Sequence, residues 1–166
     1  INALIRDRRI PSIPTYIDSP MASSVTALYE KYADEHRISR AELQEPDQNP
    51  LSFPSLSYTQ TPQDSKRLND LKGPAIIISA SGMATGGRVV HHLKAMAPDA
   101  RNTILLSGFQ AGGTRGARLL AGEPSIKIHG EQVPVRAEVA SLHNLSAHAD
   151  ADELLQWLRR WRRRGT

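Results

Sequence analysis

Two apolar runs, each followed by a glycine-rich turn and a helix pattern, limit what this chain can fold into. PAIIISA at residues 74–80 precedes SGMATGG and the amphipathic segment RVVHHLKAMA, and NTILLSG at residues 102–108 precedes FQAGGTRG and ARLLAG. Continuous apolar runs are typical of strands that are buried on both faces of a sheet. Because strand, turn and helix follow one another twice, the sequence predicts an α/β fold with a parallel sheet.

The segment before these two units predicts another strand and helix. IPTYI at residues 13–17 combines β-branched and aromatic residues between prolines, which indicates a short strand. In the following DSPMASS, Asp18 or Ser19 can cap a helix that has Pro20 at its first position. Four residues spaced as one helical face support this helix: Val25, Leu28, Tyr29 and Tyr32.

Residues 39–73 carry weaker patterns. SRAELQ at 39–44 predicts a short second helix, and SKRLNDLKG at 65–73 predicts another helix that ends at Gly73. Between them, residues 46–63 are rich in proline, serine, glutamine and asparagine, so we expect a long loop with one irregular strand.

The pattern changes after Pro124. SIKIHGEQVPVRAEVASL alternates apolar and polar residues around a turn at HGE, which predicts a hairpin of antiparallel strands. NLSAHAD then leads into a final helix, whose apolar face is formed by Leu154, Leu155, Leu158 and Trp161.

Composition narrows the class of protein. The chain has 166 residues, of which 39% are hydrophobic and 23% charged, and this suits one globular domain or one domain with part of another. It has no cysteine, which excludes disulfides and thiolate metal sites and is compatible with a cytoplasmic location. No stretch approaches the ~18 consecutive apolar residues of a membrane span. The first residue is Ile and no leader is evident, so we expect a piece of a longer protein.

The charge balance bears on possible partners. A net charge of +4 and an isoelectric point near 9.7 favour a polyanionic partner without proving one. Much of the excess comes from arginines within residues 159–164, and a solvated terminus is the simpler explanation for these. The sequence therefore allows nucleic acid as a partner, and it leaves a homodimer open.

The two glycine-rich turns are candidate phosphate sites. A turn between a buried strand and a helix directs several backbone N–H groups at one spot, and such turns of neighbouring parallel strands line one crevice. Arg88, Arg115 and Arg118 are suitable charge partners there. The spacing matches neither the dinucleotide fingerprint nor the nucleoside-triphosphate loop. The alternative is that the glycines only permit tight turns and close packing.

The histidines do not form an obvious metal site. His91 and His92 are adjacent on a predicted helix and face different directions, so we expect structural roles for both. The chain contains neither an HxHxDH nor an HExxH motif. In LHNLSAHAD, His148 and Asp150 can form an acid–base pair. Alternatively His148 is a loop residue, beside a helix that Ser146 or Asp150 caps.

Five segments follow one another in a characteristic order: DSPMA, GPAIIISASGMATGGRVVHHL, NTILLSGFQAGGTRGARLL, SIKIHGEQVPVRAEV and NLSAHAD. In this order they resemble the β-CASP branch of the metallo-β-lactamase superfamily, a group of nucleic-acid-processing nucleases. The resemblance covers about residues 10–161. It implies a Rossmann-like β-CASP domain over residues 1–124, with a parallel sheet and helices on both faces. Residues 125–166 would then be a hairpin and a strand–helix unit that return into the metallo-β-lactamase domain.

The resemblance also implies roles for particular residues. RNA would pass as a single strand through the cleft between the two domains. SAHAD corresponds to the family's motif B, so His148 would lie beside the scissile phosphate and stabilise it or protonate the leaving oxygen, without binding zinc. Asp150 would cap the last helix or orient its neighbours. Contacts to the RNA strand would come from Ser81, Gly82, Met83, Gly86, Gly87, Arg88, Gly113, Thr114, Arg115, Gly116 and Ser146.

The chain departs from the family pattern in ways that concern catalysis. The zinc motif HxHxDH and motif C are absent, Asp18 matches a later turn and not the acidic motif A, and His129 belongs to the hairpin before motif B. The resemblance implies two zinc ions in the full-length parent protein and none in this chain. We therefore expect that the isolated chain, without the metallo-β-lactamase domain, binds no structural zinc and does not cleave RNA.

Three alternatives to a ribonuclease stay open. The chain could be a catalytically inactive module that binds single-stranded nucleic acid, or part of a DNA nuclease of the same superfamily. The third is a Rossmann-like small-molecule protein, although Asp99 lies only near the position of the acidic ribose partner. Competition between RNA and DNA at fixed salt separates the nucleic-acid classes, because backbone binding depends on salt.

Overall fold

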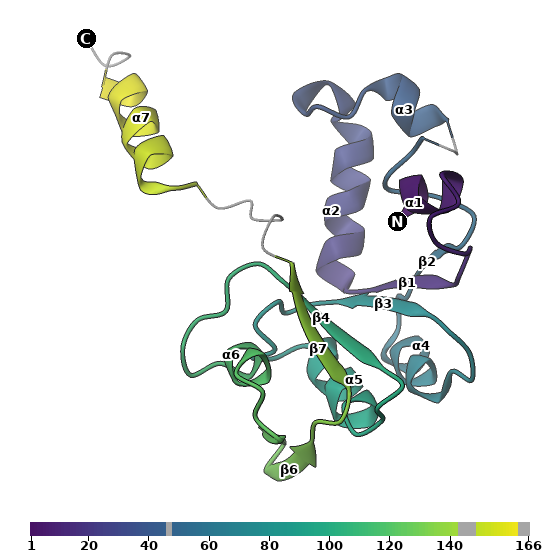
Figure 1. The fold of residues 1–166 in the computed structure, drawn as a ribbon. Helices are drawn as coiled ribbons and strands as arrows, with labels where there is room; N and C mark the ends of the chain where they lie inside the picture. The colour runs from purple at the N-terminus through teal and green to yellow at the C-terminus, as the bar shows by residue number, and fades with distance from the viewer. Residues whose placement is uncertain (46–47, 143–148, 163–166) are drawn as a thin grey trace.

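Parallel strands form the centre of the fold (Figure 1). The computed structural model describes residues 1–45, 48–142 and 149–162. The strands are β1 (Thr15–Asp18), β2 (Leu56–Tyr58), β3 (Ile76–Ser79), β4 (Thr103–Ser107), β5 (Ser125–Ile128), β6 (Glu131–Pro134) and β7 (Glu138–Leu142). One sheet has the order β2-β1-β3, with both pairings parallel, and a second sheet pairs β4 with β7 in parallel. The mixed α/β fold with parallel strands that the sequence predicts is confirmed.

Helices connect and flank these strands. They are α1 (Asn2–Arg6), α2 (Pro20–Lys31), α3 (Arg40–Gln44), α4 (Pro62–Arg67), α5 (Arg88–Met96), α6 (Arg115–Leu120) and α7 (Ala151–Arg162), with short 3₁₀ turns at Ala33–Glu35 and Leu68–Asp70. The start of α2 is as the sequence predicts, because the Ser19 side chain accepts a hydrogen bond from the backbone N–H of Ala22, with Pro20 in the first turn. Ser39 and Glu42 form a capping box at the start of α3.

The predicted helix over residues 65–73 has the wrong bounds. The helix α4 begins at Pro62, because Thr61 and Asp64 form a capping box that satisfies the first backbone N–H groups. It then tightens into a 3₁₀ turn that ends at Asp70. Gly73 lies beyond this turn and does not end the helix.

The prediction that two apolar strands are buried on both faces is also wrong. Ile78 on β3 is 44% exposed, and Leu105 on β4 is 56% exposed while its neighbour Leu106 is only 7% exposed. Successive side chains of a strand point to opposite faces of the sheet, so each strand buries mainly one face within the described residues. A continuous apolar run cannot show by itself which of its faces is covered.

The hairpin prediction is confirmed for β5 and β6 but not for β7. Ile126 pairs with Val133 in an antiparallel register, whereas β7 leaves the hairpin and pairs with β4. The change of direction has a clear cause. The backbone N–H groups of Arg136 and Ala137 both donate to the carbonyl oxygen of Ala97, at 2.8 Å and 3.0 Å, and so tie the chain to the end of α5.

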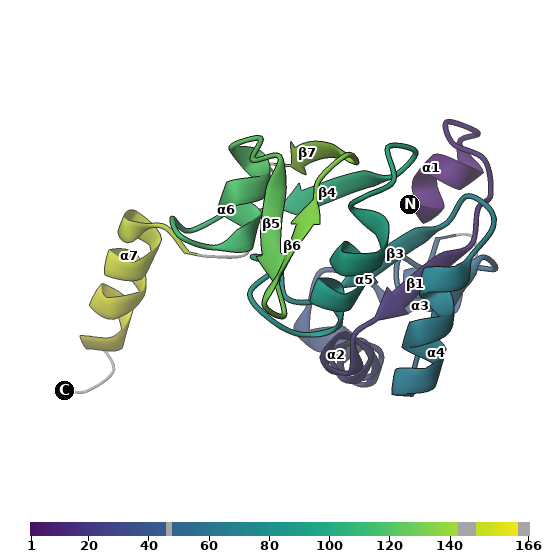
Figure 2. The same ribbon diagram turned by 90° about the horizontal axis from the view of Figure 1, so that it is seen from below.

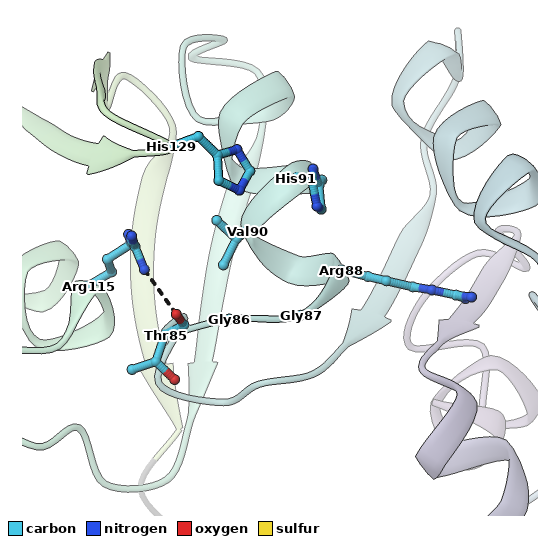
Figure 3. Close-up of a pocket in the computed structure, with 8 residues that line it drawn as sticks. All are labelled: Thr85, Gly86, Gly87, Arg88, Val90, His91, Arg115 and His129. Carbon is cyan, nitrogen blue, oxygen red and sulfur yellow. Dashed lines mark hydrogen bonds between the residues drawn. The ribbon is translucent and has the colours of Figure 1, made fainter.

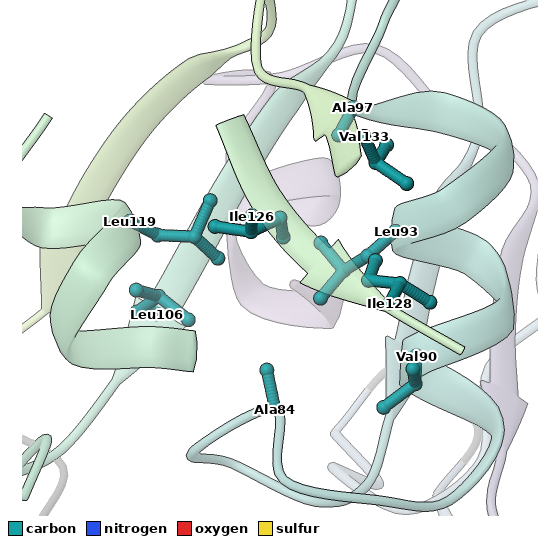
Figure 4. Packing of buried hydrophobic residues seen from close by; sticks show 9 residues of the cluster. All are labelled: Ala84, Val90, Leu93, Ala97, Leu106, Leu119, Ile126, Ile128 and Val133. Atoms are coloured by element: carbon teal, nitrogen blue, oxygen red, sulfur yellow. The ribbon is translucent and has the colours of Figure 1, made fainter. Parts of the chain in front are cut away.

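The main core lies around β5. Figure 4 shows the side chains of β5 between those of α5 and α6, and Figure 2 shows the same arrangement of these elements. The cluster consists of Ala84, Val90, Leu93, Ala97, Leu106, Leu119, Ile126, Ile128 and Val133. Ala84 belongs to the glycine-rich turn after β3 and is 1% exposed. Packing of Ala84 in the core therefore holds this turn in place. The other residues of the turn remain at least partly accessible to solvent.

The last helix has an exposed apolar face. Figure 1 shows α7 apart from the sheets, beyond residues 143–148. Its apolar residues Leu154, Leu155 and Leu158 are 51%, 49% and 48% exposed. No helix in the described parts of the chain is both long enough and apolar enough to cross a membrane.

Candidate nucleic-acid interface

The structure brings the two glycine-rich loops into contact. The backbone N–H of Gly116 donates to the carbonyl oxygen of Met83 at 3.0 Å, and Gln110 Nε2 donates to the carbonyl oxygen of Gly82 at 3.1 Å. A Cβ at position 116 would collide with the end of the Gln110 side chain, which would have to move, and would lie 3.3 Å from the Met83 carbonyl oxygen. The glycine thus allows the first turn of α6 to approach the loop between β3 and α5.

Arg115 fastens the loops to the hairpin. Its Nε donates to the carbonyl oxygen of Lys127 at 2.6 Å, and its Nη1 donates to the carbonyl oxygens of Ala84 and Thr85, both at 3.1 Å. Figure 3 shows the bond to Thr85. A planar guanidinium suits this role, because its donors point in fixed directions. The arginine that the sequence suggests as a phosphate partner therefore also holds the first loop in position.

Hydroxyl groups fix the shape of each loop from within. Ser81 Oγ accepts from the backbone N–H of Thr85 at 3.2 Å, and Thr114 Oγ1 caps α6 by accepting from the N–H of Ala117 at 3.2 Å. Both side chains are thus engaged in the protein. Gly82 and Gly113 are exposed, so the loops present backbone groups to solvent at these two positions. Backbone amides are suitable donors for phosphate oxygens.

The last glycine of the first loop has a backbone conformation that other residues avoid. We expect Gly87→Ala to destabilise the fold by about 2 kcal/mol or more, because φ is +77° and a Cβ would lie 2.7 Å from the Ala80 carbonyl oxygen. Chemical denaturation measures this change. Gly86→Ala is the matched control, since nothing lies within 4 Å of its Cβ position. An equal loss in both variants would contradict the steric argument.

Arg88 has an internal role. Its Nη1 donates to Asp18 Oδ1 at 2.7 Å, its Nη2 donates to the carbonyl oxygen of Gln60 at 3.1 Å, and the side chain is only 18% exposed. Figure 3 shows the Arg88 side chain directed away from Arg115. This placement differs from the phosphate contact that the sequence suggests for Arg88, and such a contact stays a prediction.

Asp18 is the centre of a buried polar cluster that the sequence patterns did not reveal. Its carboxylate is fully buried, and it accepts hydrogen bonds from Ser65 Oγ at 2.6 Å, from His92 Nε2 at 2.7 Å, from Thr59 Oγ1 and from Arg88. Burial alone would raise the pKa of this carboxyl. The four hydrogen bonds together outweigh burial and lower the pKa from 3.8 to about 2. The ionised carboxylate thus anchors α5 to β1 and α4.

The two adjacent histidines of α5 lie in different surroundings, as their spacing predicts. His92 is buried, and its Nδ1 lies 2.7 Å from Asn69 Oδ1 while its Nε2 bonds to Asp18. His91 is exposed and its ring lies 4.8 Å from the ring of His129, centroid to centroid. No sequence pattern indicates the pairing of His91 with His129, because His129 comes from the turn between β5 and β6.

These two exposed histidines border a pocket of about 320 Å³ (Figure 3). The pocket is lined by Thr85, Gly86, Gly87, Arg88, Val90, His91, Arg115 and His129. It therefore begins at the end of the first glycine loop and extends along α5 toward the hairpin.

Part of the predicted site lies outside the described residues. Ser146 and His148 belong to this part, so their roles stay predictions. Asp150 is described and caps α7, because its Oδ1 accepts from the backbone N–H of Glu153 at 2.8 Å while Glu153 Oε2 accepts from the N–H of Asp150 at 3.0 Å.

The described residues do not provide a zinc site. Within residues 1–45, 48–142 and 149–162, no group of three or more histidine, cysteine, aspartate or glutamate side chains could hold a metal ion. A zinc centre needs at least three such ligands. The described part of the chain therefore supplies fewer ligands than such a centre needs.

Comparison with known families gives two matches in order along the chain. A family model described as the Beta-Casp domain matches residues 1–119. A second model, described as the Zn-dependent metallo-hydrolase RNA specificity domain, matches residues 132–165. The first match covers both glycine loops, and the second covers SAHAD.

Curated relatives include enzymes and termination factors. Ribonuclease TTHA0252 of Thermus thermophilus is 40% identical over 153 residues, which cover 90% of this chain and 35% of that protein. Transcription termination factor FttA of Thermococcus kodakarensis is 32% identical over 159 residues, covering 92% of this chain and 24% of that protein. FttA of Pyrococcus abyssi is 32% identical over 158 residues, with 91% and 24% covered. The chain thus spans about a third of the ribonuclease and about a quarter of each factor.

Proposed function

Because the chain belongs to the β-CASP family of the metallo-β-lactamase superfamily, we propose that it forms the RNA-holding part of a zinc-dependent ribonuclease. The observation that carries this proposal is the contact between the two glycine loops through Gly116 and Met83. Joined in this way, the loops offer backbone amides from two βα units to one strand. The relative named as a ribonuclease supports RNA hydrolysis as the reaction of the whole protein.

In this proposal the chain binds single-stranded RNA through the phosphate backbone. Ser81 to Met83 contribute from the first loop and Gly113 to Arg115 from the second, and they contact phosphates without reading bases. Gly116 is buried and acts by joining the two loops. Arg115 acts partly by positioning, since it holds the first loop through two carbonyl oxygens. The net charge of +4 supports the attraction of a polyanion.

The catalytic share that we assign to this chain is small. His148 would act as a proton donor beside the scissile phosphate. Ser146 would contact the RNA strand nearby, and Asp150 would cap the start of α7. The ligands of two zinc ions would lie outside these 166 residues, in the metallo-β-lactamase domain. Residues 1–124 would form most of the β-CASP domain, and residues 125–166 the return into its partner domain. A cytoplasmic location suits this reading, because the chain has no cysteine.

A charge placed in the first loop tests the proposal. We expect Gly82→Asp to lower the affinity for a single-stranded RNA on the order of tenfold, because the new carboxylate would repel the phosphate backbone. The fold should tolerate the change, since a Cβ at position 82 meets only the Ser107 carbonyl oxygen, at 3.9 Å. Fluorescence anisotropy at several salt concentrations measures the affinity.

Gly73→Asp is the matched control, because it adds the same charge at an exposed glycine with nothing within 4 Å. An equal loss of affinity in both variants would contradict the loop assignment and leave only a general charge effect. The same measurement with DNA of equal length tests the substrate class. Tighter binding of DNA than of RNA would favour a DNA nuclease.

A further inference from the structure

Two imidazoles and a guanidinium converge on the pocket beside α5. His91 comes from the second turn of the helix, and His129 comes from the turn between β5 and β6, where it has a φ of +48°. Their ring centroids are 4.8 Å apart and the ring planes are inclined by 44°. Figure 3 shows both rings at the rim of the pocket, with Arg115 on the opposite side.

Basic side chains line the pocket. None of the eight described residues that line it carries a carboxylate. Glu131 is the acidic residue whose charge interacts with His129, and its carboxylate is paired with Lys94 at 2.9 Å. Arg115 uses Nε and Nη1 for carbonyl oxygens, while its Nη2 has no acceptor among the described residues. The pocket lining therefore offers hydrogen-bond donors from His91, His129 and Arg115 and no carboxylate that would repel an anion.

We propose that this pocket is a phosphate subsite, in which His91, His129 and Arg115 bind one phosphate group of a nucleic-acid strand. Imidazole nitrogens and guanidinium groups are natural donors for phosphate oxygens, and charge-assisted hydrogen bonds of this kind are the strong ones. A metal ion fits the pocket less well. Two imidazoles offer only two ligands, and the described residues supply no third one within reach of a metal.

The subsite lies next to the proposed strand contact. Thr85 and Gly86 belong both to the first glycine loop and to the lining of the pocket. A strand held by the loop can therefore continue over α5 toward the hairpin, and its next phosphates would meet the two histidines. The assignment to an RNA strand rests on the proposed function. The inference adds His91 and His129, which belong neither to the glycine loops nor to SAHAD.

Inorganic phosphate is the first probe. Titrated at constant ionic strength, it should shift the ring signals of His91 and His129 in NMR spectra of the 166-residue chain in a saturable way. The ring of His36, which bonds to the Tyr29 carbonyl oxygen, should not move. The double variant His91→Gln/His129→Gln should lower the affinity for single-stranded RNA on the order of threefold to tenfold. It should also reduce the slope of log affinity against log salt by about 1.

Lys72→Gln is the matched control, since it removes a positive charge from an exposed residue outside the pocket. The double variant and the control should melt like the wild type, because both histidines are exposed. Three results would overturn the subsite: no saturable shift with phosphate, shifts with Zn²⁺ but not with phosphate, or RNA affinity lowered no more than in the control. Phosphate binding without any RNA binding would instead refute the proposed function, and with it the assignment to a strand.

Discussion

Replacing Asp18 with asparagine is expected to destabilise the fold by about 3–5 kcal/mol, because it leaves buried donors without their anionic partner. The carboxylate has no exposed surface and accepts from four side chains, among them Arg88 at 2.7 Å and His92 at 2.7 Å. An asparagine amide has one acceptor oxygen where the carboxylate has two. Urea denaturation of wild type and variant at neutral pH measures the difference.

The same substitution should change how stability depends on pH. The pKa of Asp18 in the folded protein is lowered to about 2 from 3.8, so its contribution is complete above pH 3.8 and is lost as pH falls through about 2. The shift corresponds to about 2 kcal/mol. We therefore expect the difference in unfolding free energy between wild type and Asp18→Asn to become smaller by about 2 kcal/mol as pH falls from 3.8 to below about 2.

Asp99 provides the control for this prediction. Its pKa is also lowered to about 2, chiefly by hydrogen bonds from Arg101, but its side chain is 38% exposed. Solvent screens such a pair, so Asp99→Asn should change stability little. Two results would contradict burial as the reason for the loss of stability in Asp18→Asn. One is an equal loss of unfolding free energy in Asp99→Asn, and the other is a stability difference between wild type and Asp18→Asn that does not change with pH.

The features that could be predicted from the sequence are those that depend on a few neighbouring residues. The glycine turns after β3 and β4 follow from backbone requirements at positions such as Gly87, whose φ is +77°. The start of α2 follows from Ser19 and Pro20 for the same reason, because a cap involves only the next turn. Local rules of this kind predicted the strand–turn–helix units and the position of both loops.

The features that could not be predicted depend on which segments meet in space. The pairing of β7 with β4 depends on hydrogen bonds to the Ala97 carbonyl oxygen, and nothing near residue 138 in the sequence indicates this contact. Asp18 looked like a helix cap because its four partners come from segments between residues 59 and 92. The meeting of His91 with His129 also joins two elements that are 38 positions apart. Each of these contacts is fixed by tertiary packing.

His148 carries the largest expected effect on activity. We expect His148→Ala to lower kcat for RNA cleavage by about 10²–10⁴-fold, because a positioned proton donor contributes this much to the rate. The measurement needs a zinc-bearing partner domain. A chimera in which this chain replaces the matching third of the Thermus thermophilus ribonuclease provides one, since the two are 40% identical over 153 residues. RNA affinity should change little, because in the proposed function His148 acts on the leaving oxygen while the loops hold the strand.

A second histidine of the same stretch separates chemistry from structure. His143→Ala makes the same substitution five positions earlier, at a residue with no assigned role, and should leave kcat within about threefold of the unmodified chimera. An equal loss of kcat in both variants would indicate that the stretch acts only through its conformation. A loss of RNA affinity with unchanged kcat in His148→Ala would assign the residue to binding. Only a loss confined to kcat and to His148 supports a proton donor supplied by this chain to a metal centre on another domain.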